Sequence, residues 1–216
     1  MSRISRFAIA LAAFVVLGVA AMPARADIVF IQGPTSAADE NIQFNSPGLI
    51  STGNPVTGST NQTNTVFNFS SNVNLTTPSA GQARIERAGG GTFNTLTITP
   101  VNPLVTFNEL DFNINAVANG FVTFTATEDN GQMMTSQAFS LDASGQNFFS
   151  VTAINNQRIR SVMFTTTVGI QDVRQVRVGG IATGTPTAPI PEPTTMLLFG
   201  TGLAGVAARL RKRRKS

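Results

Sequence analysis

The side chains best suited to chemistry in this chain are its carboxylates. The chain has no histidine and no cysteine, which excludes the usual serine and thiol triads and any thiolate metal site. Pairs of carboxylates remain, and such pairs carry out glycoside hydrolysis. The candidate pairs are Asp39–Glu40, Glu109 with Asp111, and Glu128–Asp129.

Glu109 and Asp111 form the most regular of these pairs. They stand two positions apart in an apparent strand, so both side chains share the face opposite Leu110 and Phe112. A solvated sheet face explains this spacing as well as a hydrolase site does. We favour the solvated face and expect no catalytic residue, keeping a carboxylate-pair glycoside hydrolase as the third hypothesis for the function.

Calcium is the one cofactor that the sequence leaves open. Turn oxygens are calcium ligands, and two sets are available: Glu128, Asp129 and Asn130, or Asp142 with Ser144. Neither set has the spacing of an EF-hand loop, and hairpin-turn chemistry accounts for the first without a metal. We therefore expect no cofactor, with calcium as the alternative.

Sugar binding has little direct support in the residues. Sugar sites commonly stack a ring on tryptophan or tyrosine, and the chain has neither. Phe112 and Phe124 fall at inward, alternating positions typical of a core.

A basic stripe is a further candidate for binding anionic polysaccharide. Its members are Arg158, Arg160, Arg174 and Arg177. Arg158 and Arg160 flank Ile159, a spacing that suits an exposed edge strand protected against aggregation. We favour the edge strand.

The segments that position these side chains alternate polar and apolar residues with a period of two. This pattern, rich in valine, isoleucine, threonine and phenylalanine, predicts strands with one buried face. Asn119–Gly120 and Asp129–Gly131 separate strong runs and favour tight hairpin turns. Residues 33–64 are rich in proline and glycine, which indicates irregular structure with one edge strand at most. The expected strands are 27–32, 41–44, 65–70, 82–87, 92–99, 104–115, 121–127, 133–140, 147–153 and 159–178, the last divided into two.

The net charge of +4 misrepresents the central part of the chain. Nine of the 15 lysines and arginines lie in the two terminal segments, whereas all 11 acidic residues lie between Asp27 and Glu192. Six arginines remain there, which gives a net charge near −5. A domain of this charge is not attracted to phosphate, so we expect no nucleic-acid partner.

The N-terminus predicts export. An apolar run at 7–21 follows a short positive region, as in a secretory signal. Ala24 and Ala26 supply the small residues that signal peptidase needs, which places cleavage before Asp27. A lasting membrane anchor is the alternative, but the run is shorter than the roughly 20 apolar residues of a full span.

The C-terminus combines three parts in a fixed order. Pro191, Glu192 and Pro193 form a stiff, extended peptide with one charge, because each proline fixes its own φ and restricts the residue before it. An apolar span follows at 194–210, and a basic cluster ends the chain. The positive-inside rule keeps this cluster cytoplasmic and turns the preceding domain outward. The basic residues are Arg209, Arg211, Lys212, Arg213, Arg214 and Lys215.

This tail resembles the PEP-CTERM sorting domain of exported bacterial proteins. The resemblance rests on the Pro-Glu-Pro triplet, the glycine-containing apolar segment and the basic end. It implies recognition by a membrane-embedded exosortase in the inner membrane, and an association with bacteria that make exopolysaccharide and biofilm matrix. An ordinary C-terminal membrane anchor is the alternative.

Together these features predict an all-β chain built as an antiparallel two-sheet sandwich of jelly-roll type, between a signal helix and a transmembrane helix. The segments are a signal peptide (1–26), the sandwich (27–178), a Pro/Gly/Thr linker (179–190) and the sorting segment (191–216), whose basic tail is 209–215. The leading function is a structural or adhesive protein of the surface or matrix, anchored with its domain in the periplasm and then released. The runner-up is a carbohydrate-binding module for exopolysaccharide.

Overall fold

The chain folds into strands in a computed structural model that describes residues 28–35, 37–78, 83–143 and 146–184. No helix occurs within these ranges, and therefore none that is long and apolar enough to cross a membrane. The all-β prediction is confirmed. The predicted signal peptide, cleavage site, transmembrane helix and sorting residues lie outside the described residues.

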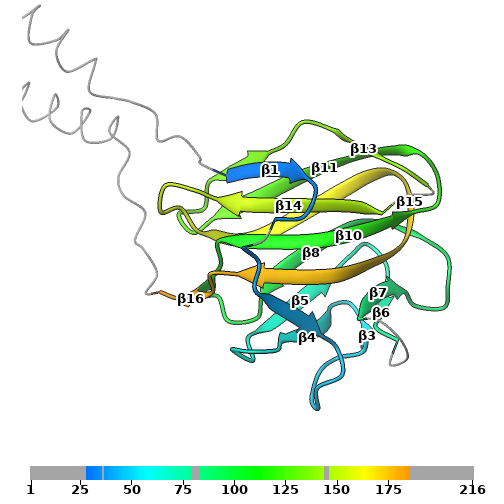
Figure 1. Ribbon diagram of the computed structural model, residues 1–216. Coiled ribbons are helices and arrows are strands. Elements are labelled where there is room, and N and C mark those ends of the chain that lie inside the picture. Colours follow the sequence, from blue (N-terminus) through cyan, green and yellow to red (C-terminus); the bar gives the residue numbers. More distant parts are fainter. Residues whose placement is uncertain (1–27, 36, 79–82, 144–145, 185–216) are drawn as a thin grey trace, which may run out of the picture. The chain divides into compact units, whose positions relative to one another are not determined.

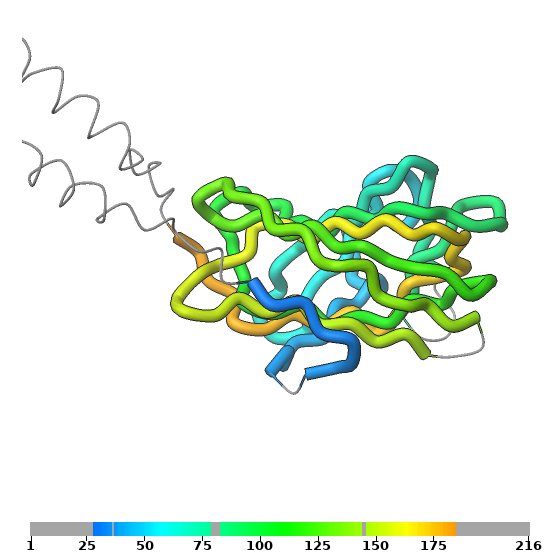
Figure 2. Tube along the Cα trace, turned by 90° about the horizontal axis from the view of Figure 1, so that it is seen from above, coloured from blue at the N-terminus to red at the C-terminus, as the bar shows by residue number. Residues whose placement is uncertain are grey.

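The strands build a two-layered sandwich that closes like a barrel along one side (Figures 1 and 2). One layer has the antiparallel order β1 (Ile28–Gln32), β14 (Asn147–Ala153), β10 (Glu109–Ala116) and the second half of β15 (Ile159–Gly179), followed by β2 (Glu40–Gln43) and β7 (Arg84–Arg87). The other contains β11 (Gly120–Glu128), the first half of β15, β8 (Phe93–Pro100), β5 (Val66–Ser70) and β4 (Val56–Thr60). The layers join where β4 pairs with β2.

Short strands complete these layers. The edge of β11 carries β12 (Met133–Thr135) and β13 (Phe139–Leu141). The pairs β3 (Thr52–Gly53) with β6 (Leu75–Thr76), and β9 (Val105–Thr106) with β16 (Ala182–Thr183), hold loops and the end of the domain.

β15 corrects the expectation of two strands at 159–178. It is one strand of 21 residues that belongs to both layers. Its first part pairs with β11 and β8, and its second part with β10, β7 and β2. The register to β8 shifts between Thr165 and Ile170, and Gln175 has φ +55°. Such bulges bend a strand without ending it.

Residues 33–64 contain more strand than expected. β2 lies between β15 and β4, so it is not an edge strand, and every residue of β4 is buried. The sequence Val-Thr-Gly-Ser-Thr hides this burial because only one of its side chains is strongly apolar. Gly58 is needed there because a Cβ would lie 2.5 Å from Ile42 Cγ2 and 2.6 Å from Phe44 Cε1.

The segment between β1 and β2 crosses the outer face of β14 and β10 (Figure 1). We call residues 33–39 the strap, described except for position 36. The Ser150 hydroxyl donates to the Gly33 carbonyl at 2.7 Å. Thr35 donates from its amide and its hydroxyl to the Asp111 carboxylate, each at 3.2 Å. The strap therefore covers polar side chains that alternation alone would leave in water.

The two predicted glycine turns have different causes. Gly131 has φ +88° in the turn between β11 and β12, as the sequence indicates. Gly120 has no positive φ; it lies in β11, where a Cβ would meet the Val168 and Thr167 side chains at under 3 Å. There, close approach rather than turn geometry requires glycine.

The first part of the predicted linker belongs to the folded domain. β15 continues to Gly179, and Ala182 and Thr183 pair with β9. The Gly184 amide donates to the Leu104 carbonyl at 2.9 Å. The division of the remaining chain into linker and sorting segment stays a prediction.

Candidate functional site

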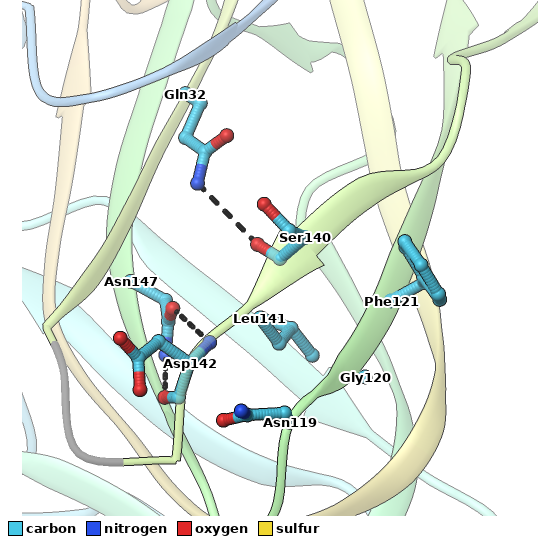
Figure 3. A pocket seen from close by; sticks show the side chains of 8 residues that line it. All are labelled: Gln32, Asn119, Gly120, Phe121, Ser140, Leu141, Asp142 and Asn147. Carbon is cyan, nitrogen blue, oxygen red and sulfur yellow. Dashed lines mark hydrogen bonds between the residues drawn. The ribbon is translucent and has the colours of Figure 1, made fainter.

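An open groove lies where the ends of β1, β11, β13 and β14 come together (Figure 3). Its volume is about 550 Å³. Among the described residues that line it, four have uncharged polar side chains, one has a carboxylate and one has an aromatic ring. The lining residues are Gln32, Asn119, Gly120, Phe121, Ser140, Leu141, Asp142 and Asn147.

Buried Asn147 fixes one wall of the groove. Its Nδ2 donates to the Asp142 carbonyl at 2.9 Å, and its Oδ1 accepts the Asp142 amide at 2.8 Å (Figure 3). The same Nδ2 also donates to the Ile114 carbonyl at 2.9 Å. The main chain at Asp142 is therefore held from both sides. The exposed Asp142 side chain starts from this fixed main chain and lines the groove.

Two other amides connect the walls. Gln32 Nε2, at the end of β1, donates to the Ser140 carbonyl of β13 at 3.3 Å. Asn119 Oδ1 accepts the Ala143 amide at 2.9 Å, which leaves its Nδ2 as a donor at the groove. These contacts join segments more than 20 residues apart in the chain, so the groove depends on the completed sandwich.

Phe121 supplies an exposed aromatic surface that the sequence analysis missed. Its exposed fraction is 54%, whereas Val122 and Phe124 on the same strand are 0% and 1% exposed. The strand alternation contained this signal: if Val122 and Phe124 point inward, Phe121 must point outward. Phe112 and Phe124 are buried, which confirms their predicted core positions.

The groove offers the contacts that a hydroxyl-rich, partly apolar ligand requires. Amide, hydroxyl and carboxylate groups donate to and accept from hydroxyl groups. An exposed aromatic face provides apolar area at small cost in conformational entropy. Rings that carry hydroxyl groups at the rim and C–H groups on the face fit both features, and sugars have this chemistry.

Glu109 and Asp111 are buried, which corrects the expectation of a solvated sheet face. Their exposed fractions are 3% and 4%. Both do share one face of β10, but the strap lies over it. Burial, together with the nearby charges of Asp111 and Asp39, raises the pKa of Glu109. Its Oε1 has no hydrogen-bond partner among the described residues. A pair so enclosed does not reach a polysaccharide.

Glu109→Gln is expected to stabilise the protein at neutral pH. The pKa of Glu109 is raised in the folded state, so the stability that its protonated form contributes is fully present below the unfolded pKa of about 4.3. The wild-type protein loses this stability as pH rises through the folded-state pKa. The variant should melt about 2–4 °C higher at pH 8, and the gain should disappear by pH 4. Thermal melts of both proteins across this range measure it; a gain that persisted at pH 4 would contradict the burial argument.

The other carboxylate pairs have structural contacts. Burial opposes ionisation of Glu40, but hydrogen bonds from the Thr63 amide and hydroxyl, both at 2.9 Å, outweigh it and lower the pKa of Glu40. Asn130 Nδ2 donates to Glu128 Oε2 at 2.9 Å, and Asn130 Oδ1 accepts the Gln132 amide at 2.7 Å. These bonds belong to the β11–β12 turn.

The calcium alternative remains untested. Among the described residues, no group of three or more acidic, histidine or cysteine side chains is arranged to hold a metal ion. Asp142 lines the groove, and Ser144 lies outside the described residues.

Arg158 and Arg160 do not form the predicted exposed edge strand, and their guanidinium groups are engaged in hydrogen bonds. β15 is paired on both sides along its first half. Arg158 donates to the Thr106 hydroxyl and carbonyl, to Asn108 Oδ1 and to the Gly180 carbonyl. It thereby joins β9 to the end of β15. Arg160 donates to the Asp129 carbonyl at 2.7 Å. Arg158 and Arg160 flank Ile159, and this spacing suggested a solvent-exposed face. Their guanidinium groups instead form hydrogen bonds to neighbouring loops.

Comparison with known proteins identifies the tail. Residues 189–214 match the family described as the PEP-CTERM protein-sorting motif. The chain therefore ends in a PEP-CTERM sorting motif. The match confirms the resemblance drawn from Pro191, Glu192 and Pro193 and from the basic cluster. It indicates an exported protein that is membrane-anchored and then processed, and it covers no part of the sandwich. A comparison with curated proteins gives no match.

Solved structures similar to the chain are carbohydrate-binding modules of low identity. One is the CBM22-1 xylan-binding domain of Paenibacillus barcinonensis Xyn10C, at 11% identity and TM-score 0.39, over 70% of this chain and 100% of that one. Another is CBM29_1 from Piromyces equi, at 6% identity and TM-score 0.33, over 74% and 95%. A third is the family 11 carbohydrate-binding module of Lic26A-Cel5E from Clostridium thermocellum, at 15% identity and TM-score 0.32, over 67% of this chain and 96% of that one. At these scores the likeness supports no conclusion about a ligand.

Proposed function

We propose that this PEP-CTERM protein is a non-catalytic polysaccharide-binding protein of the cell surface or matrix. In this proposal signal peptidase removes residues 1–26, and the tail holds the protein in the inner membrane with its domain in the periplasm. Exosortase then processes the tail at Pro191–Pro193. The jelly-roll connectivity predicted from the sequence belongs to the proposal as well.

The groove is the observation that supports this function. Phe121 lines the same groove as Asn119, Ser140 and Asp142, so an exposed ring and several polar groups face one ligand space. The chain has no tryptophan or tyrosine for a sugar ring to stack on. Exposed Phe121 offers an aromatic face in their place.

We propose a non-catalytic protein because of where its carboxylates lie. A glycosidase needs two carboxyl groups that flank the scissile bond. Glu109 and Asp111 lie under the strap, and Glu40 and Glu128 are buried in turn contacts. In the part of the chain that the structure describes, Asp142 is the single carboxylate that lines the groove.

A structural or adhesive role without a sugar ligand is the second candidate. β1 stands at the end of the strand order and exposes Val29 and Ile31, at 38% and 40%. An edge strand without charge or proline favours association between copies. Concentration-dependent oligomers that form equally with and without polysaccharide would favour this role.

Phe121→Ala tests the proposal directly. We expect it to weaken binding of the purified full chain to polysaccharide by about tenfold, because loss of an anchoring aromatic side chain in a binding site costs about 1–2 kcal/mol. Affinity electrophoresis on polysaccharide-containing gels gives the dissociation constants. Met133→Ala, which removes a 66% exposed side chain from β12, serves as the control and should bind as wild type. Equal binding by wild type and Phe121→Ala would refute the groove as the site.

A further inference from the structure

The groove carries negative charge and no positive charge on the described residues that line it. Among the described residues that line the groove, Asp142 is the only one with a formally charged side chain. The remaining polar groups are amides and a hydroxyl, which suit hydroxyl groups and give no compensation for an anionic ligand.

The arginines of the described residues cannot supply the missing positive charge from within the groove, because none of them lines it. Arg174 is bound through two nitrogens by the Asp172 carboxylate, at 2.6 and 2.8 Å. Arg84 pairs with Glu86. Arg158, directly before the start of β15, donates hydrogen bonds to four acceptors. Positive charge in this domain is thus used mainly for internal contacts.

The surrounding charge has the same sign as Asp142. The described residues contain nine acidic side chains against six arginines. A polyuronate such as alginate or polygalacturonate would bring one carboxylate per ring into the groove, where Asn147 holds the main chain of Asp142. At separations near 4 Å, two like charges close to a protein surface repel by about 1–4 kcal/mol. Repulsive groups of this kind determine specificity as strongly as attractive ones do.

We infer that the groove selects uncharged polysaccharide and that Asp142 is the residue that excludes uronic-acid polymers. The inference rests on the proposed polysaccharide-binding function and names its ligand class. It differs from the basic-stripe hypothesis, which predicts the opposite preference.

The test compares each acidic polysaccharide with its own carboxyl-reduced form, which lacks the negative charge. Alginate, polygalacturonate and xanthan are each prepared in native and carboxyl-reduced form, and binding to the full chain is measured in 20 mM NaCl. We expect the reduced form of at least one polymer to bind about tenfold or more tightly than its native form, corresponding to about 1.4 kcal/mol. Raising NaCl to 0.5 M should narrow this gap, because the screening length falls below 10 Å.

Two variants assign the preference to a residue. Asp142→Asn keeps the shape of the side chain and removes its charge, so native polymers should gain affinity while reduced ones bind within about threefold of wild type. Asp39→Asn removes the same charge from an exposed position outside the groove and should change neither.

The outcomes separate the two claims. Native polymers that bind as tightly as their reduced forms, with loss in Phe121→Ala, would overturn the exclusion of acidic sugars and leave polysaccharide binding in place. A preference for reduced polymers that Asp142→Asn leaves unchanged would overturn the role of Asp142. No binding to any of the six polymers or to the neutral glucan laminarin would contradict the proposed function itself.

Discussion

Phe124→Ala will lower the free energy of unfolding by about 3–5 kcal/mol, the range for truncating a buried phenylalanine. The Phe124 ring is 1% exposed and lies at the centre of the aromatic core. Its ring centroid is 5.0 Å from that of Phe149 and 5.7 Å from that of Phe112. It also contacts Phe30, Phe139 and Phe164.

The size of this effect follows from the position of the ring. Phe30 and Phe149 come from β1 and β14, whereas Phe124 and Phe139 come from β11 and β13. Truncation would therefore leave a cavity at the contact between the two layers. Because a domain of this size has a total stability of about 5–15 kcal/mol, the variant should be partly unfolded at 37 °C.

Urea unfolding followed by far-ultraviolet circular dichroism measures the loss. Phe121→Ala is the matched control, since it makes the same change three residues earlier on the same strand, at an exposed position. It should cost less than about 1 kcal/mol. Similar losses in the two variants would contradict the assignment of Phe124 to the core and of Phe121 to the groove.

Glu192→Ala, or deletion of residues 211–215, will leave most of the protein as unprocessed precursor in the membrane. Glu192 carries the single charge of a peptide that its two prolines hold extended. Removing it takes away the charged contact offered to the processing enzyme. Removing the basic residues weakens the topogenic signal that keeps the C-terminus cytoplasmic.

Immunoblots of the membrane and the culture medium separate precursor from processed protein. Thr187→Ala, four residues before Pro191, is the control and should be processed as wild type. Normal removal of the tail in both the Glu192→Ala and the deletion variant would contradict the sorting account and favour an ordinary membrane anchor.

Alternation of polar and apolar residues was sufficient to predict the strands and much of the core. Phe112 and Phe124 point inward as the pattern indicates, and β11 and β14 begin and end within one residue of the expected positions. The strand expected at 104–115 is divided into β9 and β10, and β10 begins only at Glu109. β4 escaped prediction because its burial depends on neighbours rather than on its own composition. β15 was divided wrongly because a bulge and a strand break leave similar signals in sequence.

The groove could not be predicted, because its residues meet only through the fold. Gln32 ends β1, Asn119 precedes β11, and Asp142 follows β13, so the strand order must be known before these side chains can be placed together. Glu109 and Asp111 were placed in water for a related reason. Their own strand predicts an outward face correctly, but the strap that covers this face comes from a segment more than 70 residues earlier.

The affinity of the full chain for laminarin and for carboxyl-reduced alginate, polygalacturonate and xanthan, compared between wild type and Phe121→Ala, tests the proposed function most directly. We predict saturable binding by wild type and about tenfold weaker binding by the variant, while the two proteins unfold at nearly the same urea concentration. Absence of binding by wild type, or equal binding by both proteins, would contradict the proposed function.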